Sequence, residues 1–210
     1  VGFAAVLAGG CPLRQLILAG QVKPAQAALA AELDLKLVDY FRREELTVAN
    51  AAATAEGTVQ VILEHLERSL LGSQCLGLGF GRIGKLLARK LRVLGADVTV
   101  SARKAQDLEL ARILGFRRIK TGNWAGALAQ YDGIVNTVPA PVVIPEHLQS
   151  IRKDCALLEL ASLPGGFCTE AQALPGYLAA RGLPGQYAPE SAAAIIRSAI
   201  FRSLNQEEAS

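Results

Sequence analysis

The sequence predicts a doubly wound parallel α/β sheet, joined by a long helix to part of a second α/β lobe. Three observations lead to this fold class. Short apolar runs alternate with helical patterns over residues 74–188, the order that builds a parallel sheet. A glycine-rich turn at residues 79–84 follows one of these runs directly. A long amphipathic pattern precedes that run and separates it from a further stretch of alternating strand and helix patterns at the start of the chain.

These patterns divide the 210 residues into four segments. Residues 1–52 are expected to be the remainder of an N-terminal α/β substrate lobe, and residues 53–73 the connecting helix. Residues 74–188 form the larger sheet domain, and residues 189–210 a C-terminal helix that packs back towards the N-terminal lobe. The sequence begins at Val1, within an apolar stretch, and contains no methionine, so we expect an N-terminal portion to precede it.

The first lobe is expected to contain strands at residues 16–20, 35–40 and 47–49. Pro24 suits the first turn of an alanine-rich helix between the first two strands, and residues 41–45 are expected to form a charged loop or short turn. The connecting helix begins near Ala53 with Thr54 as its N-cap. One apolar face supports this helix, made by Val59, Ile62, Leu63, Leu66 and Leu70.

The larger domain is expected to continue the alternation to its end. Its strands are predicted at residues 75–78, 98–100, 118–120, 133–136 and 156–160. Helical segments are predicted at residues 86–94, 108–114 and 125–130, and the C-terminal helix that follows the domain at residues 192–204. Parallel strands bring their carboxyl ends to one edge of the sheet, where ligands bind in folds of this class.

The glycine-rich turn reads Gly79-Phe80-Gly81-Arg82-Ile83-Gly84 and stands between a predicted strand and a predicted helix. Gly79 permits the tight turn, Gly81 lets the backbone approach a pyrophosphate, and Gly84 lets the helix pack close to the sheet. Unpaired N–H groups at the helix start favour the anion. In this setting the turn predicts a Rossmann domain that binds a dinucleotide.

The tip of the second strand indicates NADP, with NAD the less favoured cofactor. A domain built for NAD usually carries an acid about 20 residues beyond the glycines, to accept from the ribose 2′-OH. This window instead holds Ser101, Arg103 and Lys104. A serine and two cations suit a 2′-phosphate, which arginine can bind through a planar fork.

Three further turns follow predicted strands or precede the last helix. The first, Asn136-Thr137-Val138-Pro139, offers an amide and a hydroxyl to the ribose or nicotinamide. The second is a bend of small residues around Ser162, where a flat ring could approach the backbone. The third is Gly182-Leu183-Pro184-Gly185.

Composition excludes several classes of function. A net charge of +3 and 5% aromatic residues do not resemble a nucleic-acid interface. No apolar run is long enough to span a bilayer. Two histidines and four scattered cysteines form neither a metal spacing nor a disulfide framework, so we expect no metal and a reducing cytoplasm.

These motifs occur in the same order in one known family. Thr54-Ala55-Glu56-Gly57-Thr58, the glycine turn, Asn136-Thr137-Val138-Pro139, Leu160-Ala161-Ser162 with Pro164-Gly165-Gly166, and Gly182-Leu183-Pro184-Gly185 carry the resemblance. From about residue 10 to its end, the chain resembles the A subunits of dipicolinate synthase from spore-forming bacteria.

The resemblance implies an NADP-dependent oxidoreductase that converts dihydrodipicolinate to dipicolinate, on a branch of the lysine and diaminopimelate pathway. It also implies a flavoprotein-like B subunit as partner and the mother cell of a sporulating bacterium as location. We further expect a homo-oligomer. The catalytic candidates are Asn50, Thr54, Glu56 and Ser162, with Glu56 as the general base or a substrate-orienting group.

Two positions depart from the family pattern. Leu163 and Glu190 stand where the resemblance leads us to expect cations, which could bind the substrate carboxylates. Arg14, Arg42 or Arg43 are alternative sources of a cation. Two other functions therefore stay open: a dehydrogenase of the shikimate or hydroxyacid type, and a nucleotide-binding partner without catalysis.

Overall fold

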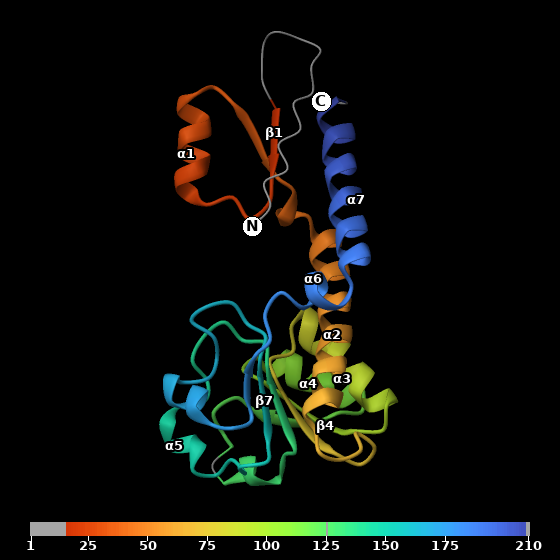
Figure 1. The fold of residues 1–210 in the computed structure, drawn as a ribbon, viewed down its shortest axis with the longest axis vertical. Coiled ribbons are helices and arrows are strands. Elements are labelled where there is room, and N and C mark those ends of the chain that lie inside the picture. Colours follow the sequence, from red (N-terminus) through yellow and green to blue (C-terminus); the bar gives the residue numbers. More distant parts are fainter. Residues whose placement is uncertain (1–15, 125, 209–210) are drawn as a thin grey trace. The chain divides into compact units, whose positions relative to one another are not determined.

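The computed structural model describes residues 16–124 and 126–208, and the chain divides into two compact units (Figure 1). Unit 1 takes in the described residues up to Asn50 and those from Pro189 onward. Unit 2 comprises Ala51–Ala188. Each unit is described separately below.

Unit 2 is built on a six-stranded sheet in which every paired strand is parallel. The strands lie in the order β5-β4-β3-β6-β7-β8, so the chain leaves the middle of the sheet in both directions. This is the strand order of a dinucleotide-binding fold, and it confirms the predicted doubly wound sheet. The strands are β3 (Gln74–Leu78), β4 (Asp97–Ala102), β5 (Arg117–Lys120), β6 (Gly133–Asn136), β7 (Ala156–Glu159) and β8 (Tyr177–Ala179).

The strands of unit 2 separate two apolar cores because successive side chains point to opposite faces of a sheet. Cys75, Val135 and Leu158 face one core, and their neighbours Leu76 and Ile134 face the other. Figure 1 shows α3 and α4 on one side of the sheet and α5 on the other. The helices after the first strand are α3 (Arg82–Val93), α4 (Ala105–Ile113), η2 (Ala127–Gln130), α5 (Pro145–Leu148), η3 (Thr169–Ala173) and α6 (Leu183–Tyr187).

Four elements of unit 2 were not expected from the sequence. β8 has three residues, α5 has four, and η3 and α6 have five each. The predicted turn at residues 182–185 is therefore the start of a short helix, with Gly182 as its N-cap residue. None of the four is long enough to show a periodicity of its own, and β8 lies at an edge of the sheet without a long apolar run. Pairing with β7 is what extends this segment.

The helix α2 (Glu44–His65) begins earlier than predicted. The strand expected at residues 47–49 is wrong, and Thr54 lies inside the helix rather than at its N-cap. Glu44 and Glu45 occupy the first turn, where negative charge suits the helix dipole. The Thr47 hydroxyl donates to the Glu44 carbonyl oxygen at 2.8 Å, so this β-branched residue is accommodated within the first turns. The helix ends at His65, before the predicted limit.

Unit 1 contains a parallel pair, β1 (Leu16–Ala19) and β2 (Lys36–Asp39), with α1 (Pro24–Glu32) between them in the chain. The Asp39 carboxylate accepts from the backbone N–H groups of Gln21, Val22 and Phe41 at 2.9–3.1 Å and so holds the ends of both strands. The short helix η1 (Tyr40–Arg42) follows. The apolar core of unit 1 includes Leu18, Tyr40 and Leu46, with Ala199 from α7 (Pro189–Glu208).

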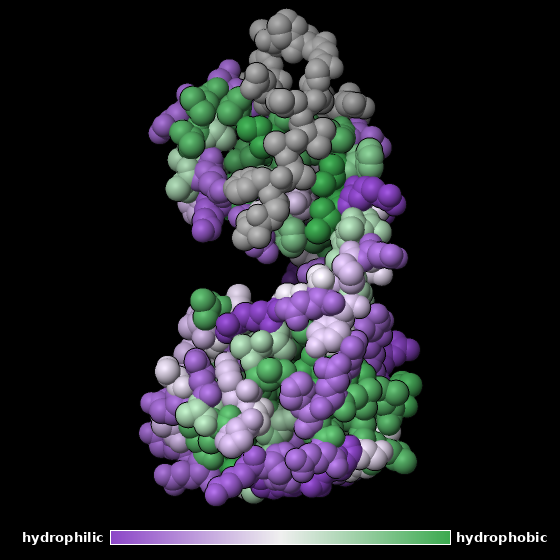
Figure 2. Space-filling view, in the orientation of Figure 1, coloured by the Kyte–Doolittle hydropathy of each residue, from purple (hydrophilic) through white to green (hydrophobic). Residues whose placement is uncertain are grey.

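An apolar surface lies on the right-hand side of unit 2 in Figure 2, where the loop before β3 and the end of α3 lie in Figure 1. Among the exposed apolar residues of unit 2 are Leu71 and Val93, which are 74% and 78% exposed, and Leu94, which is 46% exposed.

No helix in the described ranges is long and apolar enough to cross a membrane. Among the same residues, no three His, Cys, Asp or Glu side chains gather as metal ligands would.

Two buried thiols lead us to expect that unit 2 loses stability in alkali. Burial raises the pKa of Cys75 and of Cys155 from 9.0 to about 12, and the Asp132 charge adds to the rise at Cys75. Both thiols stay protonated in the folded state while the unfolded chain ionises from about pH 9 upward. The unfolded state then binds fewer protons, so stability falls from pH 9 towards pH 12.

Urea unfolding at pH 8, 9 and 10 measures this effect. We expect the free energy of unfolding to fall by about 1 kcal/mol per thiol between pH 9 and pH 10, in addition to the change from other groups. A Cys75→Ala, Cys155→Ala double variant removes that part of the slope. Equal slopes in the parent and the double variant would show that the thiols do not contribute.

Candidate functional site

The glycine turn closes β3 at the middle of the sheet, and each fingerprint glycine meets a different environment. Gly79 has φ +97°, a left-handed conformation that favours glycine. A Cβ on Gly84 would lie 2.2 Å from the Gly79 carbonyl oxygen, so only glycine allows α3 to start this close to the strand. A Cβ on Gly81 would meet no atom within 4 Å. The loop is therefore tight at its two ends and open at its centre.

The open centre fits a pyrophosphate. Gly81 is the N-cap residue of α3, and no side chain caps the helix there. The first-turn N–H groups and the positive end of the helix dipole can therefore serve an anion. Arg82 is exposed and Ile83 half-buried in that turn. The Phe80 ring is buried and packs against Phe116 in the core, so only the backbone of Phe80 belongs to the site.

Two of the three predicted 2′-phosphate residues follow β4, the strand next to β3, and the third lies within it. Arg103 and Lys104 are both exposed directly after the strand, and within the described part of the chain neither side chain makes an ion pair or hydrogen bond. Ser101 is placed differently. It is fully buried, and its hydroxyl lies 2.9 Å from the Thr121 hydroxyl, so the structure does not bring it to the surface with the two cations.

The turn after β6 lies level with the glycine loop, because Leu78 pairs with Asn136 in the sheet. The Thr137 hydroxyl donates to the Leu78 carbonyl oxygen at 2.9 Å, and the same oxygen accepts from the Thr137 N–H. These bonds hold the turn against the glycine loop. Val138 is half-buried and Pro139 is exposed beyond it.

A buried carboxylate that the sequence did not single out lies beside this turn. Glu159 ends β7, is 1% exposed, and pairs with Asn136 in the sheet. Its Oε1 accepts from Asn136 Nδ2 at 2.7 Å and from the Ala161 N–H at 2.9 Å. Its Oε2 accepts from the N–H groups of Gly166 at 2.7 Å and Phe167 at 3.2 Å. Glu159 therefore fixes residues 161–167 across the end of its strand.

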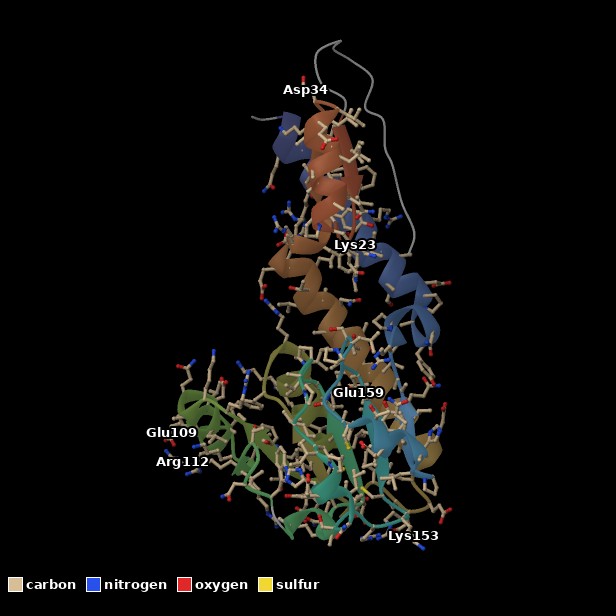
Figure 3. The ribbon with its side chains drawn as sticks, turned by 90° about the vertical axis from the view of Figure 1, so that its left-hand side faces the viewer. Lys23, Asp34, Glu109, Arg112, Lys153 and Glu159 are labelled. Carbon is tan, nitrogen blue, oxygen red and sulfur yellow. The ribbon has the colours of Figure 1, made fainter. Side chains whose placement is uncertain are left out.

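The bend held by Glu159 carries the predicted residue Ser162, which is exposed. Lys153 precedes β7 and Glu159 is its last residue, and Figure 3 shows the two at opposite ends of unit 2. The bend that follows Glu159 therefore lies at the carboxyl end of the sheet. Arg181 reaches the same bend and donates from Nε to the Ala161 carbonyl oxygen at 2.7 Å. Burial raises the pKa of the nearby Tyr177 phenol, and the Glu159 charge raises it further.

The predicted residues on α2 have other surroundings. Glu56 is exposed, and its carboxylate accepts from Lys90 Nζ at 2.8 Å. Lys90 lies about 12 Å further along α3 than Arg82, the first residue of the helix, at 1.5 Å per residue. Thr54 is 8% exposed, and its carbonyl oxygen accepts from the Thr58 hydroxyl at 2.7 Å. Asn50 lies in the same helix, within unit 1.

The structure thus brings together three strand ends, those of β3, β6 and β7, with Arg103 and Lys104 beside them at the end of β4. It does not bring Glu56 to this group, and the role of Glu56 as a base stays a prediction. Glu159 could have been noticed as a charged residue at the end of an apolar strand. Nothing local in the sequence pairs it with Asn136 or with the bend.

The two departures from the expected pattern are both exposed. Leu163 is 78% exposed within the bend. Glu190 lies in the first turn of α7, where its charge suits the helix dipole. Of the alternative cations, Arg14 lies outside the described residues. Arg43 donates to Glu45 at 2.6 Å and to Gln206 at 2.8 Å within unit 1, and Arg42 lies in η1 of the same unit.

Comparison with known proteins gives close relatives along nearly the whole chain. The chain is 31% identical over 201 residues to the A subunit of dipicolinate synthase of Bacillus subtilis (strain 168), and the match covers 94% of this chain and 67% of that protein. The crystal structure of this Bacillus subtilis protein matches with a TM-score of 0.86 at 31% identity, over 92% of this chain and 66% of that chain.

Two more solved structures extend the comparison. The A subunit of dipicolinate synthase from Bacillus halodurans matches with a TM-score of 0.84 at 29% identity, over 90% of this chain and 66% of that chain. A transhydrogenase from Sinorhizobium meliloti shares the fold, with a TM-score of 0.77 at 18% identity over 91% of this chain and 68% of that chain. No protein-family model matches the sequence. The chain spans about two thirds of the length of these relatives.

Proposed function

The chain belongs to the family of dipicolinate synthase A subunits, and from this premise we propose that it is an NADP-dependent oxidoreductase that converts dihydrodipicolinate to dipicolinate. The single observation that carries the proposal is the row of strand ends in unit 2. There, an open glycine loop, the turn after β6 and the bend held by Glu159 share one edge of a doubly wound sheet.

The residues of unit 2 divide the proposed work between two sides of the glycine loop. Gly81 and the first turn of α3 would bind the pyrophosphate, and Arg103 with Lys104 would bind the 2′-phosphate on the β4 side. The Asn136 amide is fully buried and bonds to Glu159 and Val138, so it is not free for the ribose or nicotinamide as the sequence suggested. The turn that begins at Asn136 and Thr137 would instead border the nicotinamide on the β6 side. The bend around Ser162 would hold the substrate ring beside it, because the bend lies one strand further along the same edge.

The reaction needs little from the protein beyond alignment. Dihydrodipicolinate loses a hydride and a proton and becomes an aromatic pyridine, so the product ring itself supplies driving force. Bound NADP would accept the hydride, and the proton would leave to a base or to water. The chain must hold the donor carbon at the nicotinamide and bind two carboxylates. Asn50, Thr54 and Glu56 on α2 remain the proposed residues for orienting the substrate or taking the proton.

Cofactor choice gives a direct prediction at Arg103. We expect Arg103→Ala to weaken NADP binding about 10-fold or more and to leave NAD binding unchanged, because charge-assisted hydrogen bonds to the 2′-phosphate are lost. Calorimetric titration with each nucleotide measures the two constants. Arg112→Ala is the matched control, since Arg112 is an exposed arginine on α4 that pairs with Glu109. A parallel loss of NAD and NADP affinity in Arg103→Ala would contradict the 2′-phosphate contact.

The names of the relatives suggest with which partner the chain acts and in which cell. Their names make them the A component of a synthase, which points to a partner. We propose that this chain acts with a flavoprotein-like B subunit in the mother cell of a sporulating bacterium. We also propose that it forms a homo-oligomer.

The activity is tested on the intact protein, with and without its B partner. Dihydrodipicolinate is generated in situ, and NADPH absorbance is followed together with the ultraviolet band of dipicolinate. The proposal predicts that both signals rise together and faster than in protein-free controls. NADP binding without dipicolinate formation above those controls would instead identify a binding subunit or an enzyme with another substrate.

A further inference from the structure

Arg181 follows β8 at the carboxyl edge of the sheet and is fixed in place by the bend of β7. The Ala180 N–H donates to the Glu159 carbonyl oxygen at 2.9 Å, so the backbone here is tied to the end of β7. The Arg181 side chain is half-buried, and its Nε donates to the Ala161 carbonyl oxygen at 2.7 Å. One edge of the guanidinium is thereby held against the bend.

The rest of the guanidinium is not used by the described residues. Arginine carries five N–H donors, and the bond to Ala161 uses one. No ion pair or further hydrogen bond from the Arg181 side chain occurs within residues 16–124 and 126–208. A positive charge with a free two-nitrogen fork is therefore present at the site.

Glu159 is the nearby carboxylate, and its own contacts show why it does not occupy this fork. Glu159 Oε2 and Arg181 Nη2 lie 2.7 Å and 3.5 Å from the position that a Cβ on Gly165 would take. The carboxylate already accepts four hydrogen bonds from Asn136 and the backbone of the bend. Its lone pairs are engaged, so the fork stays available to an external anion.

The position of Arg181 in the sheet decides which anion this is. β8 is three strands from β3, which is about 14 Å at the usual strand spacing. The pyrophosphate belongs at the end of β3 and the 2′-phosphate at the end of β4, on the other side of it. Arg181 instead lies on the side of β6 and β7, beside Ser162 and the exposed Leu163, where a substrate rather than a phosphate is expected.

We propose that Arg181 binds one carboxylate of a ring dicarboxylate substrate through its Nη1 and Nη2 groups. This inference rests on the proposed function and names a residue for it. Paired N–H donors match the two oxygens of a carboxylate, and the bond to Ala161 orients the fork before the substrate arrives. Arg181 thus supplies, from the end of β8, the cation that Leu163 does not provide within the bend.

The test measures binding of dipicolinate, picolinate and NADP to the full protein by calorimetry. We expect Arg181→Gln to weaken dipicolinate binding at least 10-fold and Arg181→Lys to weaken it less, with NADP affinity changed by less than about 2-fold. The preference of the parent protein for dipicolinate over the monocarboxylate picolinate should shrink in Arg181→Gln. Steady-state assays should show a higher KM for dihydrodipicolinate at an unchanged KM for NADP.

Arg118→Gln is the matched control, because Arg118 is an exposed arginine on β5 at the other edge of the sheet. It should leave all three affinities unchanged. Unaltered dipicolinate affinity in Arg181→Gln would overturn the proposal, as would a joint loss of dipicolinate and NADP binding with a lower melting temperature. A parent protein that binds NADP but neither binds dipicolinate nor forms it overturns the proposed function itself, which separates the two failures.

Discussion

Gly81→Asp is expected to abolish NADP binding without lowering the stability of unit 2. Gly81 is the N-cap residue of α3 and has extended backbone angles, φ −78° and ψ −160°, which aspartate adopts readily. A Cβ at this position meets no atom within 4 Å. Aspartate is a favoured N-cap residue, so the variant should gain a few tenths of a kcal/mol. Its carboxylate would occupy the N–H groups meant for the pyrophosphate and repel that anion.

We expect the dissociation constant for NADP to rise at least 100-fold, measured by calorimetry, with an unchanged or slightly higher melting temperature. Gly84→Ala is the contrasting variant. Its Cβ would lie 2.2 Å from the Gly79 carbonyl oxygen, so it should lower the melting temperature as well as the affinity. A Gly81→Asp protein that binds NADP like the parent would show that the pyrophosphate is not held at the start of α3.

Glu159→Leu is expected to destabilise unit 2 by about 4 kcal/mol, because loss of the carboxylate leaves several buried N–H donors without an acceptor. The N–H groups of Ala161, Gly166 and Phe167 would lose their acceptor in a region with little access to water. Asn136 Nδ2 would keep only its bond to the Val138 carbonyl oxygen. A leucine also cannot replace the charge-assisted bonds that hold the bend. Urea unfolding followed by circular dichroism measures the change.

Two further variants sharpen this result. Glu159→Gln keeps the shape of the side chain but turns an NH2 group towards N–H donors, so it should retain part of the stability lost in Glu159→Leu. Glu146→Gln, at an exposed position on α5, should change stability by less than about 0.5 kcal/mol. If Glu159→Leu is as stable as the parent, the four hydrogen bonds do not hold the bend.

Much of unit 2 could be predicted from short stretches of sequence. The turn Gly79–Gly84 predicted the strand, the helix and the open loop between them, because glycine conformations and helix periodicity are local properties. The order of motifs along the chain also predicted the family, which the comparisons confirmed. The start of α2 was predicted wrongly because Thr47 and Val48 favour strands on their own, whereas the acidic first turn and the residues beyond them continue the helix.

The sequence by itself determined the glycine loop, the alternating strands and the exposed cations after β4, since each depends on residues within a few positions of one another. Only the tertiary structure decided the other half of the candidate site. Glu159 bonds to Asn136, 23 positions away, Arg181 to Ala161, 20 positions away, and Ser101 to Thr121, also 20 positions away. Such contacts arise when parallel strands align at one edge of a sheet, because strand order and register bring together residues that no local pattern connects.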